Sequence, residues 1–200
     1  PKTSSAASDV YKRQFLYFRI KNSGGDRRFH TIRNSFPTFC MTWTLQGAWV
    51  YLTSCAALAA VTSSNTVGLD AIFFVGFGIW AFGFAIEVIA DRQKTAFRAD
   101  PDNADKFIKT GLWAWSRHPN YFGEILLWAG IAVMAYPALV GWQALTLLAP
   151  IWVVLQMTAI SGTRMLEARA NKTWGSDPEY QAYKKSTPLL MLWPPRKQAS

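Results

Sequence analysis

Residues 68–90 read GLDAIFFVGFGIWAFGFAIEVIA, and only Asp70 and Glu87 in this stretch have ionisable side chains. A helix needs about 20 mostly apolar residues to cross the hydrocarbon core of a bilayer. The stretch also contains four glycines, and small residues let neighbouring helices approach closely in lipid. It therefore predicts a membrane-spanning helix at the centre of a helical bundle.

Three more apolar stretches flank this one. The predicted spans are Trp43–Val61, Tyr121–Tyr136 and Leu139–Ile160, and the second of them begins near Pro119. A water-soluble helical core is the rival interpretation, but the remaining polar residues are too few to cover four such segments. We therefore predict an all-α fold, a polytopic transmembrane helical bundle with about four complete spans.

The basic residues lie on one side of these spans. Of the twenty-one Lys and Arg residues, eight lie in 1–42, six in 91–120 and seven in 161–200, and none lies in the short connectors between spans. Because cytoplasmic loops concentrate Lys and Arg, both ends and the central loop are predicted to be cytoplasmic. Topology and contact with anionic membrane lipids account for the net charge of +9, and no separate basic domain indicates nucleic acid.

The first fourteen residues, PKTSSAASDVYKRQ, resemble translated sequencing-adapter read-through, and we predict that they are not native. The native chain would then start further upstream, and residues 15–200 would form one transmembrane domain. The two cysteines, Cys40 and Cys55, have no metal-ligand spacing and do not support a disulfide framework. The sequence therefore predicts no metal site.

The sequence SRHPNYFGE, residues 116–124, places polar side chains where the third span enters the membrane. Pro119 suits the first turn of a helix, and the free N–H groups of that turn together with Arg117 predict an anion site. Glu124 falls one turn inside the span, where an ionisable group is costly unless it faces a polar cavity. The alternative is structural, because Arg117 can reach lipid headgroups and Tyr121 can belong to an interfacial aromatic belt.

The cytoplasmic end of the second span carries a second polar set. Glu87 and Asp91 are one helical turn apart and therefore lie on one face of the helix. Together with Arg98 this face offers acceptors and a donor for ribose and phosphate groups. The structural alternative is that the two acids only form ion pairs with nearby basic residues such as Arg92 or Lys94.

Three ordered stretches carry a family resemblance: IEVIADRQKTAFR (86–98), GLWAWSRHPNYFGEILLWAG (111–130) and GTRMLEARANKTWGSDPEYQAYKKSTP (162–188). Through them, residues 15–195 resemble the C-terminal part of the steroid 5-alpha-reductase-like membrane family, whose bacterial members are mostly uncharacterised. The resemblance implies a helical bundle in a bacterial inner membrane that binds NADPH from the cytoplasmic side. No Gly-x-Gly-x-x-Gly follows a strand, so such a site would differ from the Rossmann fold.

The resemblance also implies which residues contact NADPH. At the end of the second span they are Asp91 and Arg98, with Glu87 where the steroid reductases have another polar residue. At the start of the third span they are Asn120 and Glu124, with Arg117, His118 and Tyr121 beside them. In the tail they are Glu167, Tyr180 and Tyr183. These residues come from three separate parts of the chain, so the expected site exists only if the fold brings them together.

The family also has a Gln-Glu pair at the start of an early span, which engages the carbonyl of the substrate. Gln46 matches the Gln, but Gly47 replaces the Glu, and this departure puts a steroid substrate in question. The resemblance still implies reduction of a carbon–carbon double bond conjugated to a carbonyl in a hydrophobic substrate, steroid-like or another lipid. Gln46 and Glu124 are the predicted catalytic residues.

Two alternatives stay open. Isoprenylcysteine and phospholipid methyltransferases also use Arg-His-Pro-x-Tyr, there to hold S-adenosylmethionine, so a membrane methyltransferase is one of them. The other is a membrane scaffold without enzymatic activity. Glu87 and Glu124 argue against the scaffold, because an acid inside the membrane is costly and is retained only for a task.

Overall fold

The computed structural model describes residues 32, 34–160 and 162–194, and this part of the chain is helical and contains no strand. The α-helices are α3 (Phe36–Thr62), α4 (Ala71–Ala99), α5 (Pro119–Ala135), α6 (Ala149–Leu155), α7 (Gly162–Trp174) and α8 (Pro178–Ser186). The predicted all-α fold is confirmed. The predicted read-through segment, residues 1–14, lies outside the described residues.

The chain divides into two compact units after Val50, within α3. Helix α3 begins at Phe36, so the predicted start at Trp43 is seven residues too late. Pro37 falls in the first turn, where a helix does not need its missing N–H, and therefore does not delay the start. Helices α4 to α8 belong to the second unit, which carries the candidate site.

Four helical stretches among the described residues are long and apolar enough to cross a membrane. They are Phe36–Thr62, Ala71–Ala99, Pro119–Ala138 and Gly141–Trp174. Large apolar side chains on them are exposed, for example 61% for Phe82 and 87% for Trp142. A water-soluble core would bury such side chains, whereas a bilayer solvates them. The chain is therefore an integral membrane protein, and its orientation stays a prediction.

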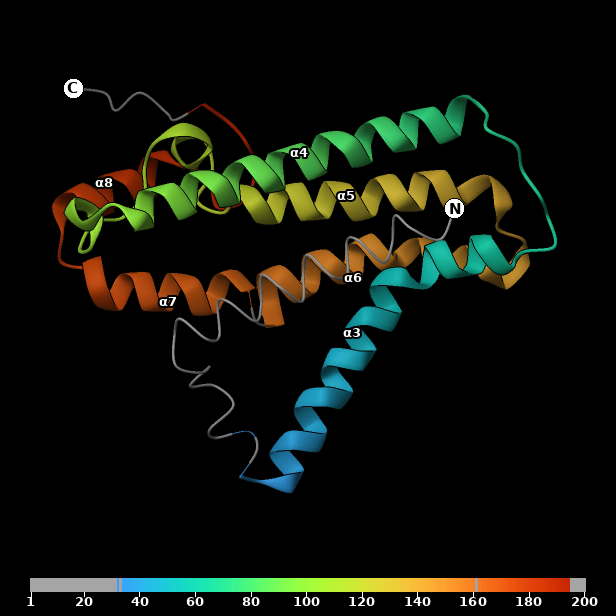
Figure 1. Ribbon diagram of the computed structural model, residues 1–200, viewed down its shortest axis with the longest axis horizontal. Coiled ribbons are helices and arrows are strands. Elements are labelled where there is room, and N and C mark those ends of the chain that lie inside the picture. The colour runs from blue at the N-terminus through green and yellow to red at the C-terminus, as the bar shows by residue number, and fades with distance from the viewer. Residues whose placement is uncertain (1–31, 33, 161, 195–200) are drawn as a thin grey trace. The chain divides into compact units, whose positions relative to one another are not determined.

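Helices α4 and α5 lie side by side and antiparallel (Figure 1). Their contact includes two glycine pairs, Gly83 against Gly123 and Gly76 against Gly130. A Cβ added at Gly83 would lie 2.6 Å from the carbonyl oxygen of Gly123, and one added at Gly130 would lie 2.6 Å from that of Gly76. Such backbone approach is possible only without side chains, and in lipid it supplies the packing that holds helices together. Close helix packing by the glycine-rich span is confirmed in its contact with α5. Its place at the centre of the bundle stays a prediction.

The segment between α4 and α5 folds back onto the end of α4. The indole Nε1 of Trp113, which is 5% exposed, donates to the carbonyl of Ala90 at 3.0 Å. Gln93 accepts a hydrogen bond from the backbone N–H of Leu112 at 2.9 Å. Helix α4 itself ends at Ala99 because Pro101 disfavours helical geometry in the residue before it. This segment, with the 3-10 helices η1 (Pro101–Asn103) and η2 (Gly111–Ala114), sets where α5 begins.

The fourth predicted span is not the single helix expected over Leu139–Ile160. After the 3-10 turn η3 (Tyr136–Ala138), the chain forms a 3-10 helix η4 (Gly141–Leu148), then α6, and then a π-helix η5 (Gln156–Ile160). Pro150 explains the first change, because it lies at the start of α6 and has no N–H to continue an α-helix from η4. Helix α6 packs against α5.

Replacing Gly83 by Ala is expected to lower the stability of the bundle by about 1–3 kcal/mol, because the new methyl group must push α4 away from α5. Gly78→Ala is the matched control on the same helix, since a Cβ at Gly78 meets no atom within 4 Å. Thermal unfolding of the two detergent-purified variants measures both changes in stability. Equal melting temperatures for the two variants would contradict the glycine contact.

Candidate functional site

A cavity of about 130 Å³, here called the basic pocket, lies between the end of α4, the start of α5, α7 and α8. Six of the eleven predicted cofactor-contacting residues line it: Arg98, Arg117, His118, Glu167, Tyr180 and Tyr183. They come from parts of the chain separated by up to 85 positions in sequence, and the fold brings them to one place. Lys94 also lines the pocket and was not among the residues predicted.

Glu167 of α7 joins the basic residues of the pocket. Its carboxylate forms an ion pair with Arg117, lies 3.1 Å from Nε2 of His118 and lies 3.7 Å from Nζ of Lys184. The side chains of Glu167 and Arg117 are only 18% and 14% exposed, so this pairing is shielded from water. Glu167 therefore fixes the orientation of Arg117 and His118 rather than leaving both free for a ligand.

Aromatic rings form much of the remaining wall. The ring of Phe107 packs edge-on against Trp174 and Tyr180, with ring centres 6.1 and 5.2 Å apart. Burial raises the pKa of both Tyr180 and Tyr183 above the usual value, so both phenols stay neutral at physiological pH. Tyr183 uses its neutral hydroxyl to donate to the carbonyl of Trp113 at 2.7 Å. Flat rings beside cations suit a ligand that has both a planar ring and anionic groups.

The start of α5 leaves polar atoms buried without a hydrogen-bond partner. Within the described part of the chain, these include Nε of Arg117 and Oδ1 of Asn120. His118 is 6% exposed and precedes α5 without capping it through a side-chain hydrogen bond. Its ring stacks on Tyr121 with ring centres 5.6 Å apart. Buried polar atoms are normally satisfied, so these unpaired ones are where a ligand would find hydrogen-bond partners.

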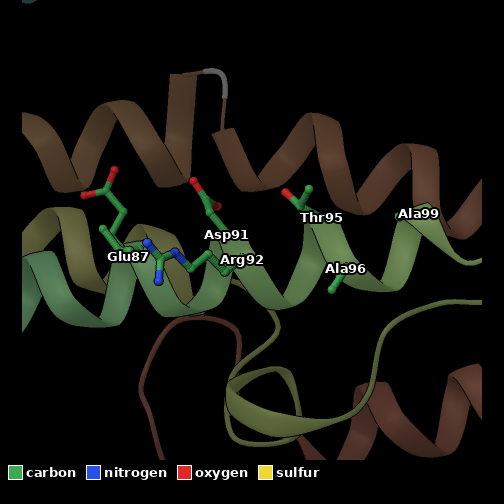
Figure 2. Close-up of a pocket in the computed structure, with 7 residues that line it drawn as sticks. Glu87, Asp91, Arg92, Thr95, Ala96 and Ala99 are labelled. Atoms are coloured by element: carbon green, nitrogen blue, oxygen red, sulfur yellow. The ribbon is translucent and has the colours of Figure 1, made fainter. Parts of the chain in front are cut away.

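A groove of about 490 Å³ follows the neighbouring face of α4 and is lined by Glu87, Asp91, Arg92 and Thr95. Glu87, Asp91 and Thr95 project from the same side of the helix (Figure 2). Glu124 of α5 interacts electrostatically with both Glu87 and Asp91. Glycine packing explains this proximity, because a Cβ at Gly123 would lie 2.8 Å from the backbone nitrogen of Glu87.

The carboxyl groups of Glu87 and Asp91 line this groove, here called the acidic groove, and the carboxyl group of Glu124 lies near both. Ionised carboxylates only accept hydrogen bonds, so they suit hydroxyl and amide donors and repel phosphates. The predicted face of Glu87 and Asp91 is thus joined by Glu124 across the helix contact.

The remaining predicted residue, Gln46, lies in α3 within the first unit, and its place relative to the site stays a prediction. Sequence reasoning missed Lys94, although its spacing of four from Arg98 placed it on the same helical face. It also missed two polar atoms of the fourth span, Nε1 of Trp152 and Oε1 of Gln156, which are buried without a partner among the described residues. The signal in the sequence was Gln156, a polar residue inside an apolar stretch.

A family described as a protein of unknown function (DUF1295) matches residues 12–187. Over 86 residues the chain is 33% identical to 3-oxo-5-alpha-steroid 4-dehydrogenase 1 of Homo sapiens, covering 43% of this chain and 31% of that relative. Steroid 5-alpha-reductase DET2 of Gossypium hirsutum is 36% identical over 64 residues, or 32% and 25% of the two chains. An uncharacterised protein of Schizosaccharomyces pombe is 26% identical over 155 residues, or 67% and 43%.

The chain thus matches less than half of the length of each of these relatives. No solved structure matches the chain.

Replacing Glu167 by Ala is expected to destabilise the protein by about 3 kcal/mol, because it leaves the shielded charge of Arg117 without its partner. Glu179→Ala is the matched control. It removes an ion pair with Lys109 whose side chains are 64% and 45% exposed, and such a surface pair contributes under about 1 kcal/mol. Thermal unfolding of both variants measures the difference, and an equal effect would show that Glu167 does not organise the pocket.

Proposed function

Because the chain belongs to the DUF1295 family of steroid 5-alpha-reductase-like membrane proteins, we propose that it is an NADPH-dependent reductase. Its substrate is a hydrophobic molecule, steroid-like or another lipid, with a carbon–carbon double bond conjugated to a carbonyl. The observation that carries the proposal is the basic pocket, which gathers six of the residues that the family resemblance assigns to the cofactor.

The residues of the pocket fit a dinucleotide phosphate. Arg98 has no ion pair with a carboxylate within residues 34–160 and 162–194, and its guanidinium lies 5.8 Å from the ring centre of Trp174. A cation that is not neutralised by the protein attracts an anionic ligand, and the guanidinium fork matches phosphate oxygens. Nε of Arg117 is buried without a partner among the described residues and supplies a further donor in the pocket. Oδ1 of Asn120 is a buried acceptor at the start of α5, outside the pocket lining.

The acidic groove fits the other end of the same cofactor. Ribose hydroxyls and the carboxamide of nicotinamide are hydrogen-bond donors, and the carboxylates of Asp91, Glu87 and Glu124 accept such bonds. Glu87 and Arg98 are eleven residues apart on α4, which is about 16 Å along the helix axis. We therefore place phosphates at the cytoplasmic end of α4 and the nicotinamide end deeper, near Glu124.

The bound cofactor supplies a hydride to the β-carbon of the substrate. The protein has three tasks beside it: to orient both partners, to exclude water and to stabilise the developing enolate oxygen. Gln46 is the proposed donor to that oxygen through its side-chain amide N–H. Glu124 orients the nicotinamide end, and the spans keep the reaction out of bulk water.

The proposed location follows from the charges and the spans. The basic pocket lies among the Lys- and Arg-rich segments, which the positive-inside rule places in the cytoplasm, where NADPH is available. The substrate reaches the site from the lipid, since large apolar side chains of the spans are exposed. We propose the inner membrane of a bacterium, with membrane lipids as the surroundings and nucleic acid not involved.

Isothermal titration calorimetry of the detergent-purified chain tests the cofactor. We expect NADPH to bind and S-adenosylmethionine not to bind. Asn120→Ala should weaken NADPH binding about tenfold, because it removes a buried side-chain amide that the family resemblance assigns to the cofactor. Binding of S-adenosylmethionine instead would favour a methyltransferase, and binding of neither would favour a scaffold.

Replacing Glu124 by Leu separates an enzyme from a scaffold. An acid inside a span costs stability, so this variant is expected to unfold at the same temperature as the wild type or higher. If Glu124 orients the cofactor, its loss should nevertheless weaken NADPH binding about tenfold or more. Thermal unfolding and calorimetry on one preparation measure both, and unchanged affinity would remove Glu124 from the proposed site.

A further inference from the structure

Lys94 occupies a position in the basic pocket that the proposed function has not used. It lies in α4 one helical turn before Arg98, so the two side chains are neighbours on the helix surface. Both line the pocket, and Lys94 is only partly exposed. A Lys is strongly hydrated, so its position beside a cavity raises the question of what compensates its charge.

No carboxylate of the described residues forms an ion pair with Lys94. Among the described residues that line the pocket, Glu167 is the only carboxylate, and it already pairs with Arg117, His118 and Lys184. Lys94 and Arg98 therefore leave two positive charges in the pocket that the protein does not neutralise there. This excess is what an anionic ligand would balance.

The side chains of Lys94 and Arg98 each lie over the ring of a tryptophan. Nζ of Lys94 lies 5.2 Å from the ring centre of Trp113, whose Nε1 donates to the carbonyl of Ala90. Arg98 lies over Trp174, whose Nε1 donates to the carbonyl of Asp105 at 2.7 Å. Each tryptophan is thus fixed by a backbone carbonyl and supports one cation through its ring face. Lys94 and Arg98 are therefore positioned before a ligand binds, and less side-chain entropy is lost on binding.

From this arrangement we propose that Lys94 is a phosphate-binding residue of the pocket and acts together with Arg98. The inference rests on the proposed function, since the phosphate belongs to the nicotinamide dinucleotide. Such a cofactor offers two sources of phosphate, the pyrophosphate bridge and the 2′-phosphate that distinguishes NADPH from NADH. Lys94 supplies up to three N–H donors to phosphate oxygens.

The test is calorimetric binding of NADPH and of NADH to the wild type, Lys94→Met, Lys94→Arg and Lys109→Met. Lys94→Met keeps a straight apolar chain and removes the charge, whereas Lys94→Arg keeps the charge. Lys109→Met removes the same charge outside the pocket, where Lys109 pairs with Glu179. We expect Lys94→Met to weaken NADPH binding about tenfold or more, and the other two variants to bind within a few-fold of the wild type.

The pattern of losses identifies the phosphate. Weaker binding of NADPH alone assigns Lys94 to the 2′-phosphate, and equal weakening of both nucleotides assigns it to the pyrophosphate. Unchanged affinity in Lys94→Met, or a drop matched by Lys109→Met, overturns the inference, as does a fall in melting temperature alone. If the wild type binds neither nucleotide, the proposed function fails, and this outcome is distinct from failure of the role of Lys94.

Discussion

The close approach of α4 and α5 through Gly76, Gly83, Gly123 and Gly130 is the contact on which the other features of the site depend. In lipid, apolar side chains gain little by leaving their surroundings, so helices associate where their backbones fit together. Two glycine pairs provide this fit and also set the register between the helices. That register places Glu87 beside Gly123 and therefore near Glu124.

The same register divides the site into two chemical environments. Towards the membrane interior, the carboxyl groups of Glu87 and Asp91 line the acidic groove, and that of Glu124 lies near both. Towards the end of α4, Lys94 and Arg98 face the aromatic walls of the basic pocket. A long ligand with hydrogen-bond donors at one end and phosphates at the other matches this sequence of charges along one helix. Both environments depend on α4 continuing to Ala99, beyond Ala90, where the apolar run stops.

Without a ligand, the charges and the unpaired polar atoms of the site lower the stability of the folded protein. Three acids of like charge lie near one another, two cations lack an acidic partner among the described residues, and Asn120 keeps a buried oxygen without a hydrogen bond. Each of these features lowers stability. Proteins tolerate such local conflicts mainly where function needs them, whereas the Glu167 pairing and the anchored Trp113 and Trp174 hold the same region together.

The helical class, the membrane spans and the close helix packing of the glycine-rich stretch could be predicted from the sequence, because apolar length and small residues act locally along a helix. Ordered motifs in the sequence also indicated six of the thirteen residues that line the basic pocket. The tertiary structure was needed to see that 3-10 and π segments break the fourth span and that Glu167 pairs with Arg117 and His118. It was also needed to see that Lys94 has no carboxylate partner among the described residues. Those outcomes depend on which side chains from distant parts of the sequence come into contact, and a pattern along the sequence does not specify such contacts.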